Sequence, residues 1–80
     1  MDKYIFFART EIIKEFCRYC KDTKKDFKSP RTKRNFLNDF ILNDIKMNGI
    51  KNIKEKTKEI ENALKYNNLT IKYYLDKMEV

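Results

Sequence analysis

Apolar residues recur at intervals of three and four along most of this chain, which is the spacing of one face of an α-helix. A first pattern of this kind covers about residues 3–27, and its apolar members are Ile5, Ile12, Ile13, Phe16, Cys17, Cys20 and Phe27. A second pattern covers Pro30 to about Asn48, with an apolar stripe of Phe36, Leu37, Phe40, Ile41 and Ile45. Each pattern predicts an amphipathic helix.

Residues with strong positional preferences mark the ends of the second predicted helix. Ser29 is a favourable N-cap, and Pro30 suits the first helical position because its missing N–H is not needed there. Gly49 follows the last apolar position and readily adopts the left-handed backbone that ends many helices. These three residues predict a helix over 30–48.

Two shorter patterns follow, separated by the polar stretch "KYNN" at residues 65–68. The first pattern has an inward face that consists of Ile53, Thr57, Ile60 and Leu64. The second pattern has an inward face that consists of Ile71, Tyr74, Leu75 and Met78. Asn52 and Glu55 resemble a capping box, and Asn68 can cap the last helix. Because 80 residues contain one Gly and one Pro, the chain lacks the turn residues of an all-β protein. We predict an all-α, small four-helix domain that covers residues 1–80.

The charge is strongly positive, with 19 Lys and Arg against 12 Asp and Glu and a net charge of +7. Residues 21–34 alone carry +5, in a basic run that includes Lys28, Arg31, Lys33 and Arg34. Such a field attracts phosphate backbones or anionic membrane surfaces. Two interpretations of the run stay open: a patch that contacts phosphates, or a solubilising junction with no partner.

The N-terminal residues "MDKYIFFARTEIIKEF" lack the long apolar region of a signal peptide, and the chain has no stretch of about 20 apolar residues. We therefore expect a cytoplasmic protein with no membrane contact. The apolar segment "YIFF" at residues 4–7 is either part of the core or a contact in a homodimer.

Two cysteines three residues apart, Cys17 and Cys20, are the first candidate chemistry. A structural zinc site needs four ligands, and the chain has no His and no third Cys. We expect two buried free cysteines, with a metal or redox role as the alternative, and no cofactor. Acidic residues alternate with Lys, as in "EKTKEIE", and there is no Gly-rich phosphate loop. We do not expect an enzyme.

Residues 58–78, "KEIENALKYNNLTIKYYLDKM", resemble the helix-turn-helix of bacterial, archaeal and phage DNA-binding regulators. Ile60, Leu64, Ile71 and Leu75 match the four apolar positions of that motif in register. The family usually has Ala and Gly where this chain has Glu61 and Lys65. The resemblance implies a wingless helix-turn-helix over residues 53–79, with a turn formed by Asn67 and Asn68, since Asn tolerates left-handed backbone angles.

The resemblance also implies a partner, double-stranded DNA, and a set of contacts. The N-terminal part of the last helix would enter the major groove with Asn67, Asn68, Thr70, Lys72 and Tyr73, and Lys77 lies farther along the same helix. Thr57, Lys58, the other lysines of residues 54–58 and the basic run would contact the DNA backbone. We expect a dimeric transcriptional regulator or mobile-element accessory protein. The alternative is a small basic helical protein that binds and inhibits a partner protein, as phage inhibitors and immunity proteins do.

Overall fold

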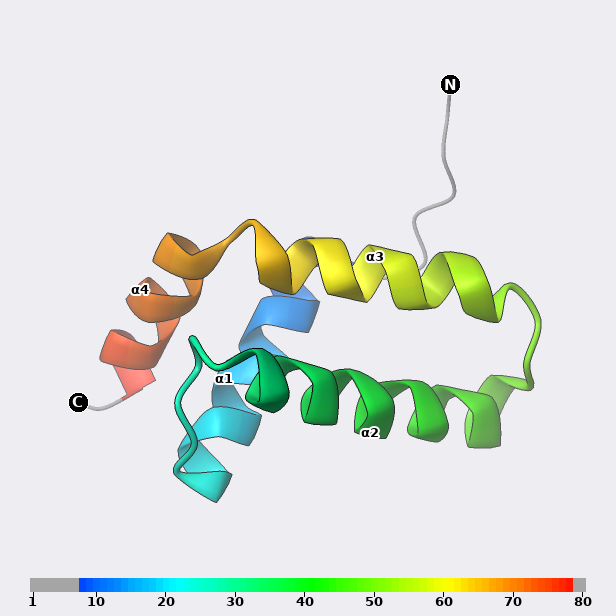
Figure 1. Cartoon of the computed structure of the whole chain (residues 1–80), viewed down its shortest axis with the longest axis horizontal. Helices are drawn as coiled ribbons and strands as arrows, with labels where there is room; N and C mark the ends of the chain where they lie inside the picture. Colours follow the sequence, from blue (N-terminus) through cyan, green and yellow to red (C-terminus); the bar gives the residue numbers. More distant parts are fainter. Residues whose placement is uncertain (1–7, 79–80) are drawn as a thin grey trace.

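The computed structural model describes residues 8–78, which form four α-helices. They are α1 (Arg9–Thr23), α2 (Pro30–Asn48), α3 (Ile53–Lys65) and α4 (Asn68–Met78) (Figure 1). This confirms the prediction of an all-α, four-helix domain. The segment "YIFF" lies outside the described residues. None of the helices within residues 8–78 is long and apolar enough to cross a membrane.

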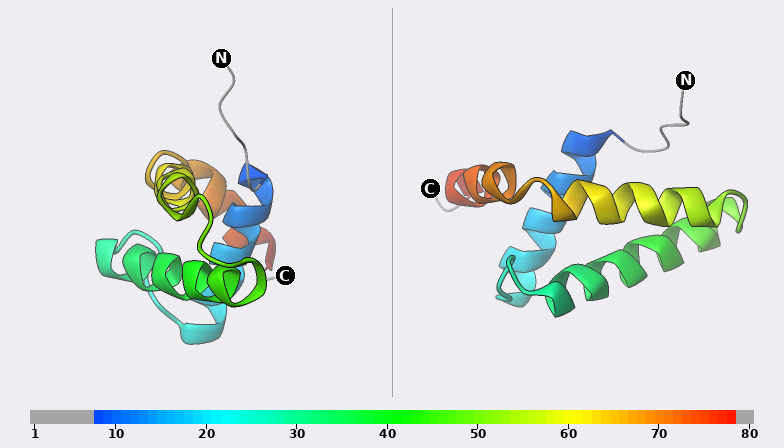
Figure 2. Two further views of the ribbon diagram at one scale, coloured as in Figure 1. Left: turned by 90° about the vertical axis from the view of Figure 1, so that its right-hand side faces the viewer. Right: turned by 45° about the horizontal axis from the view of Figure 1, so that its top comes forward.

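The helices α2 and α3 lie side by side as a hairpin, and α1 crosses this hairpin near one of its ends (Figure 2). The last helix, α4, turns away from the axis of α3 and packs mainly against α1. The opposite end of the hairpin, around residues 42–57, extends past α1, and we call it the arm. The molecule is therefore elongated, with principal extents of 37 × 28 × 21 Å.

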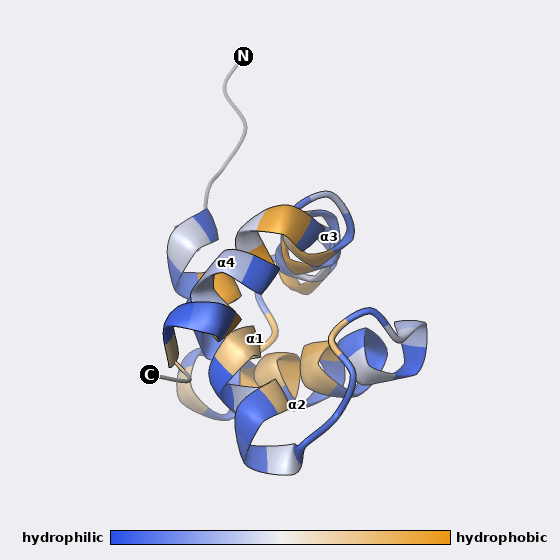
Figure 3. Cartoon of the chain, turned by 90° about the vertical axis from the view of Figure 1, so that its left-hand side faces the viewer, coloured by the Kyte–Doolittle hydropathy of each residue, from blue (hydrophilic) through white to orange (hydrophobic). Residues whose placement is uncertain are grey.

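The core lies where α1 meets the other three helices. Ile12 and Phe16 of α1, Ile60 of α3 and Ile71 of α4 are completely buried, which confirms the predicted inward faces of these helices. The ring of Phe16 packs edge-on against Phe36 of α2, with 5.2 Å between centroids. Figure 3 shows the hydrophobic segments gathered between the helices and the hydrophilic ones on the outside. The three- and four-residue spacing thus produced one shared core, with α1 at its centre.

Local sequence sets the ends of α2 as predicted. The Ser29 hydroxyl accepts a hydrogen bond from the Thr32 N–H at 3.4 Å, and Pro30 occupies the first turn. At the other end, α2 stops before Gly49 as predicted, and the Gly49 N–H donates to the Ile45 carbonyl at 2.9 Å. With a φ of 81° and a ψ of −172°, Gly49 has a positive φ but not the left-handed helical conformation that was predicted.

The end predicted for the first helix is wrong, because α1 stops at Thr23 rather than near residue 27. Lys24 adopts a left-handed conformation with a φ of 56°, and its N–H donates to the Cys20 carbonyl. The Lys25 N–H donates to the same carbonyl at 3.1 Å. These bonds close the helix, and Phe27 packs against the core from the following turn.

The predicted roles of Asn52 and Asn68 are also wrong, and Asn67 lies in the predicted turn but without a left-handed backbone. Asn52 is left-handed and makes no side-chain cap bond, so no capping box forms with Glu55. Asn68 is already inside α4, whereas the Asn67 carbonyl accepts the first helical bond, from the Ile71 N–H at 2.9 Å. The only left-handed residues other than Gly in the described chain are Lys24 and Asn52. The turn before α4 therefore uses no left-handed asparagine.

Inside the arm, a buried ion pair joins α2 to α3. The Lys56 ammonium lies 2.8 Å from the Asp44 carboxylate, and both side chains are about nine-tenths buried. The Asn48 amide also donates to Asp44, at 3.0 Å. The hydrogen bond from Lys56 holds the pKa of Asp44 below its ordinary value, although burial opposes the shift. Lys56 is thus an internal residue, and the expectation that it neutralises DNA phosphates is wrong.

Candidate nucleic-acid interface

The helix α4 has one buried face and one exposed face. Ile71 is completely buried, and Tyr74, Leu75 and Met78 pack half-buried against the core. On the other side, Leu69 is 86% exposed and Tyr73 is 54% exposed. The outer face of α4 therefore carries one apolar and one aromatic side chain that are largely exposed.

Most of the base-reading residues predicted for α4 lie on this exposed side. Thr70, Tyr73 and Lys77 follow each other at intervals of three and four, so they form one stripe. The Lys77 ammonium lies 5.1 Å from the centre of the Tyr73 ring. Lys72 is exposed on one flank of the stripe and pairs with Asp76 at 3.2 Å. Asn67 differs, because its amide donates to the Ala63 carbonyl in the turn.

The first flank of α4 meets the basic run. The Lys33 ammonium donates a 2.8 Å hydrogen bond to the Asn68 side-chain oxygen and so connects the start of α2 with the start of α4. Burial lowers the pKa of Lys33, and the neighbouring Cys20 opposes this shift. Beside this contact, a groove between α2 and α3 is lined by Lys28, Lys33, Arg34 and Lys65, with Glu61 as the one acidic residue of its lining. The basic run and the first turn of α4, which were predicted as separate sequence features, therefore meet here.

The second flank of α4 is also cationic, and it comes from α1. Lys14 and Arg18 lie beside Tyr74 and Lys77, and the Lys14 ammonium is 5.6 Å from the centre of the Tyr74 ring. Arg18 also pairs with Glu15 at 2.7 Å, at an exposed position. Sequence reasoning missed Lys14 and Arg18 as site residues. Their four-residue spacing places them on one face of α1, but nothing in the sequence reveals that this face borders α4.

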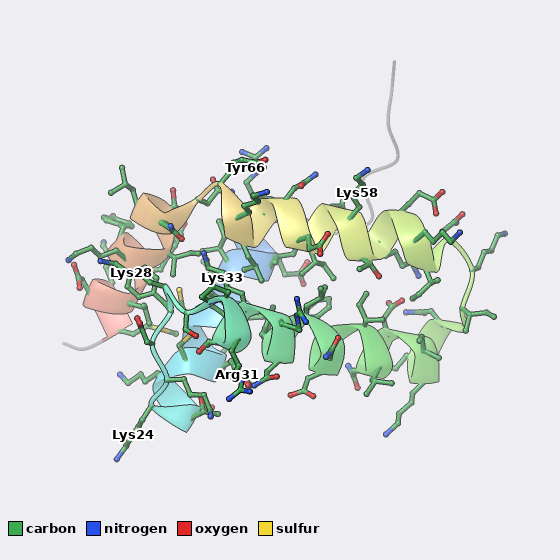
Figure 4. The ribbon with its side chains drawn as sticks, in the orientation of Figure 1. Lys24, Lys28, Arg31, Lys33, Lys58 and Tyr66 are labelled. Carbon is green, nitrogen blue, oxygen red and sulfur yellow. The ribbon has the colours of Figure 1, made fainter. Side chains whose placement is uncertain are left out.

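Three predicted DNA contacts lie elsewhere. Arg31 points from α2 away from α3, and Lys58 points outward from the opposite side of the hairpin (Figure 4). The Thr57 hydroxyl donates to the Ile53 carbonyl at 2.8 Å, within α3. The fold therefore gathers Lys28, Lys33 and Arg34 around one groove, which Lys33 connects to the start of α4, but it separates them from Arg31, Thr57 and Lys58.

The two cysteines are buried and free, as expected. The Cys17 thiol donates to the Ile71 carbonyl at 3.4 Å and so links α1 to α4. Burial raises the pKa of each thiol to about 11, which keeps both protonated at neutral pH. In the described part of the chain, no three side chains of His, Cys, Asp or Glu gather as a metal site would require.

Glu61 and Lys65, which stand where helix-turn-helix proteins usually have Ala and Gly, are both exposed. Neither side chain is therefore pressed between the two helices. No family model, curated protein or solved structure matches the chain.

Proposed function

We propose that this protein binds duplex DNA by inserting α4 into the major groove. The observation that carries the proposal is the position of the exposed stripe Thr70, Tyr73 and Lys77 between two cationic flanks. The major groove is about 12 Å wide and admits one helix, and a phosphate backbone borders it on each side. A reading helix therefore needs positive charge on both of its flanks.

The packing of α1 supports a helix-turn-helix role for α3 and α4. A three-helix unit of this kind needs a first helix that packs on both others, and α1 contacts both α3 and α4. Ile60, Leu64 and Ile71, three of the four residues that carry the resemblance, are buried in this contact region. The unit holds α4 by its inner face and leaves the outer face free for DNA.

The exposed residues have suitable chemistry for base contacts. The methyl group of Thr70 and the side chain of Leu69 can pack against thymine methyl groups. Tyr73 and Lys77 can donate hydrogen bonds to base edges or phosphates. We place the protein among small dimeric regulators of transcription or accessory proteins of mobile elements.

The proposal is tested by fluorescence anisotropy with labelled duplexes of random and genomic sequence at two salt concentrations. We expect the wild type to bind and both Tyr73→Ala and Lys77→Glu to weaken binding. Matched controls on the arm are Met47→Ala and Lys46→Glu, which change exposed residues far from α4. Equal affinities for the α4 variants and their controls contradict the proposal that α4 is the helix that enters the major groove. A wild type without duplex affinity contradicts the function itself.

A second candidate function, binding of a protein partner, is favoured by the arm. Met47 is 74% exposed and Ile50 is 71% exposed, which is unusual for two apolar residues at the end of one hairpin. A pull-down from nuclease-treated lysate separates the two functions. One stoichiometric partner that is lost with Met47→Ser and Ile50→Ser, together with no duplex binding at physiological salt, favours this candidate.

A further inference from the structure

A hollow rich in lysine lies between the end of α1, the α1–α2 loop and α4. Four lysines line it, Lys21, Lys24, Lys25 and Lys72, together with Cys20, Phe27, Leu75 and Asp76. The lysines are exposed, whereas Phe27 and Leu75 are half-buried and Cys20 is buried. The hollow therefore has a cationic rim and an apolar floor, with a volume of about 390 Å³. We call it the lysine hollow.

Two of the four lysines are already engaged with the protein. The Lys21 ammonium donates to the Met78 carbonyl, and Lys72 pairs with Asp76. Within residues 8–78, the side chains of Lys24 and Lys25 form no ion pair. Their backbone is nevertheless held in place, because both N–H groups donate to the Cys20 carbonyl. Two ammonium groups without an ion pair among the described residues thus leave a fixed helix end, and Lys24 extends outward from it (Figure 4).

We propose that the lysine hollow binds a phosphodiester of the DNA backbone through Lys24 and Lys25. This inference rests on the proposed function, and it narrows the backbone contact expected of the whole basic run to two of its lysines and one site. Among the described residues that line the hollow, four are lysines and one, Asp76, is acidic, so the charge favours an anion. The Asp26 carboxylate, which contributes to the raised pKa of Cys20, opposes this preference in part. The apolar floor excludes water from one side, which strengthens the attraction between ammonium and phosphate.

The location of the hollow matches a second phosphate on the first flank of α4. Lys33 reaches α4 at Asn68, whereas the hollow borders α4 at Lys72, Leu75 and Asp76. Along a helix, eight residues from Asn68 to Asp76 span about 12 Å. The flank therefore carries cations over most of the length of α4, as a DNA strand that follows the helix requires.

The test measures duplex affinity against salt concentration for the double variant Lys24→Ala/Lys25→Ala. The matched control Lys46→Ala/Lys51→Ala removes the same charge from the arm. We expect the hollow variant to weaken binding to all sequences and to lower the slope of log K against log salt by about 1 for each phosphate that the protein no longer neutralises. The variant Lys24→Arg/Lys25→Arg keeps the charge and should retain the slope.

Three outcomes overturn the inference. If the wild type binds duplex and the hollow variant matches its control, the inference fails alone and the proposed function stands. If inorganic phosphate shifts the NMR signals of Leu75 and the two lysines while the duplex slope stays unchanged, the hollow takes free phosphate and not the DNA backbone. If the wild type does not bind duplex, the proposed function and the inference fail together.

Discussion

Lys33 donates a hydrogen bond to the side chain of Asn68 across 2.8 Å, although the two residues are 35 positions apart in the chain. This contact holds the basic run against the first turn of α4. It joins a residue expected to contact phosphates to one expected to lie at the DNA surface. The proposed interface depends on this long-range contact.

Replacing Lys33 with Met keeps most of the apolar stem and removes the ammonium. We expect a decrease of about 1 kcal/mol in unfolding free energy, since one hydrogen bond at a partly exposed position is removed. We also expect a decrease of about 1 in the salt slope of duplex binding. Urea unfolding and anisotropy measure the two effects. Arg31→Met is the control, because Arg31 points away from α4, and an equal effect on binding there contradicts the interface.

Glu61→Gln should strengthen duplex binding. Glu61 is the acidic residue in the lining of the groove formed by Lys28, Lys33, Arg34 and Lys65, so its charge opposes phosphate. Because Glu61 is exposed, we expect a gain of roughly threefold and a change of less than about 0.5 kcal/mol in stability. Glu55→Gln on the arm changes the same charge away from the groove. Equal gains for the two variants point to net charge alone.

The ion pair between Asp44 and Lys56 should depend strongly on both partners. Lys56→Met leaves a buried carboxylate without its cation, and we expect a loss of about 3 kcal/mol in unfolding free energy. Asp44→Leu combined with Lys56→Met replaces both charges by apolar groups and should restore stability to within about 1 kcal/mol of the wild type. Urea unfolding of the full double-mutant cycle measures this. Additive losses in the double variant contradict a coupled pair.

The same pair predicts how stability changes in acid. The pKa of Asp44 is lower in the folded protein than its ordinary value of 3.8. The unfolded chain therefore takes up the proton first, so the stabilisation is present above pH 4 and is lost as pH falls through the folded pKa. Asp44→Asn should show a smaller loss over this range than the wild type. Thermal melts from pH 5 to pH 2 test this, and parallel curves exclude a contribution of Asp44.

The cysteines should be unreactive in the native protein. Burial raises both thiol pKa values from 9.0 to about 11, so little thiolate forms at pH 8. We expect slow reaction with a disulfide reagent and rapid reaction of both thiols after unfolding in urea. The unfolded chain loses its thiol protons first, so stability should fall as pH rises from about 9 towards 11. Rapid labelling of either cysteine in the folded protein contradicts this burial.

The sequence by itself determined the helices. Regular spacing of apolar residues identified four of them, and Ser29, Pro30 and Gly49 predicted the ends of α2 correctly because these residues act on the nearby backbone. Prediction was less accurate where several residue types suit the same turn. Asn52 and Asn67 each precede a helix and accept its first backbone bond, but Asn52 makes no side-chain cap bond and the Asn67 amide bonds back to α3.

Only the tertiary structure decided which charged side chains face the same surface. Nothing in the sequence around Lys56 distinguishes it from the neighbouring lysines of α3. It is nevertheless buried, because Asp44 lies opposite it on α2. Lys14 and Arg18 border α4 because α4 packs against α1, and Arg31 points away from α3 although it belongs to the basic run. Helical periodicity places a residue on a face of its own helix. The neighbour of that face depends on contacts between residues that are far apart in the chain.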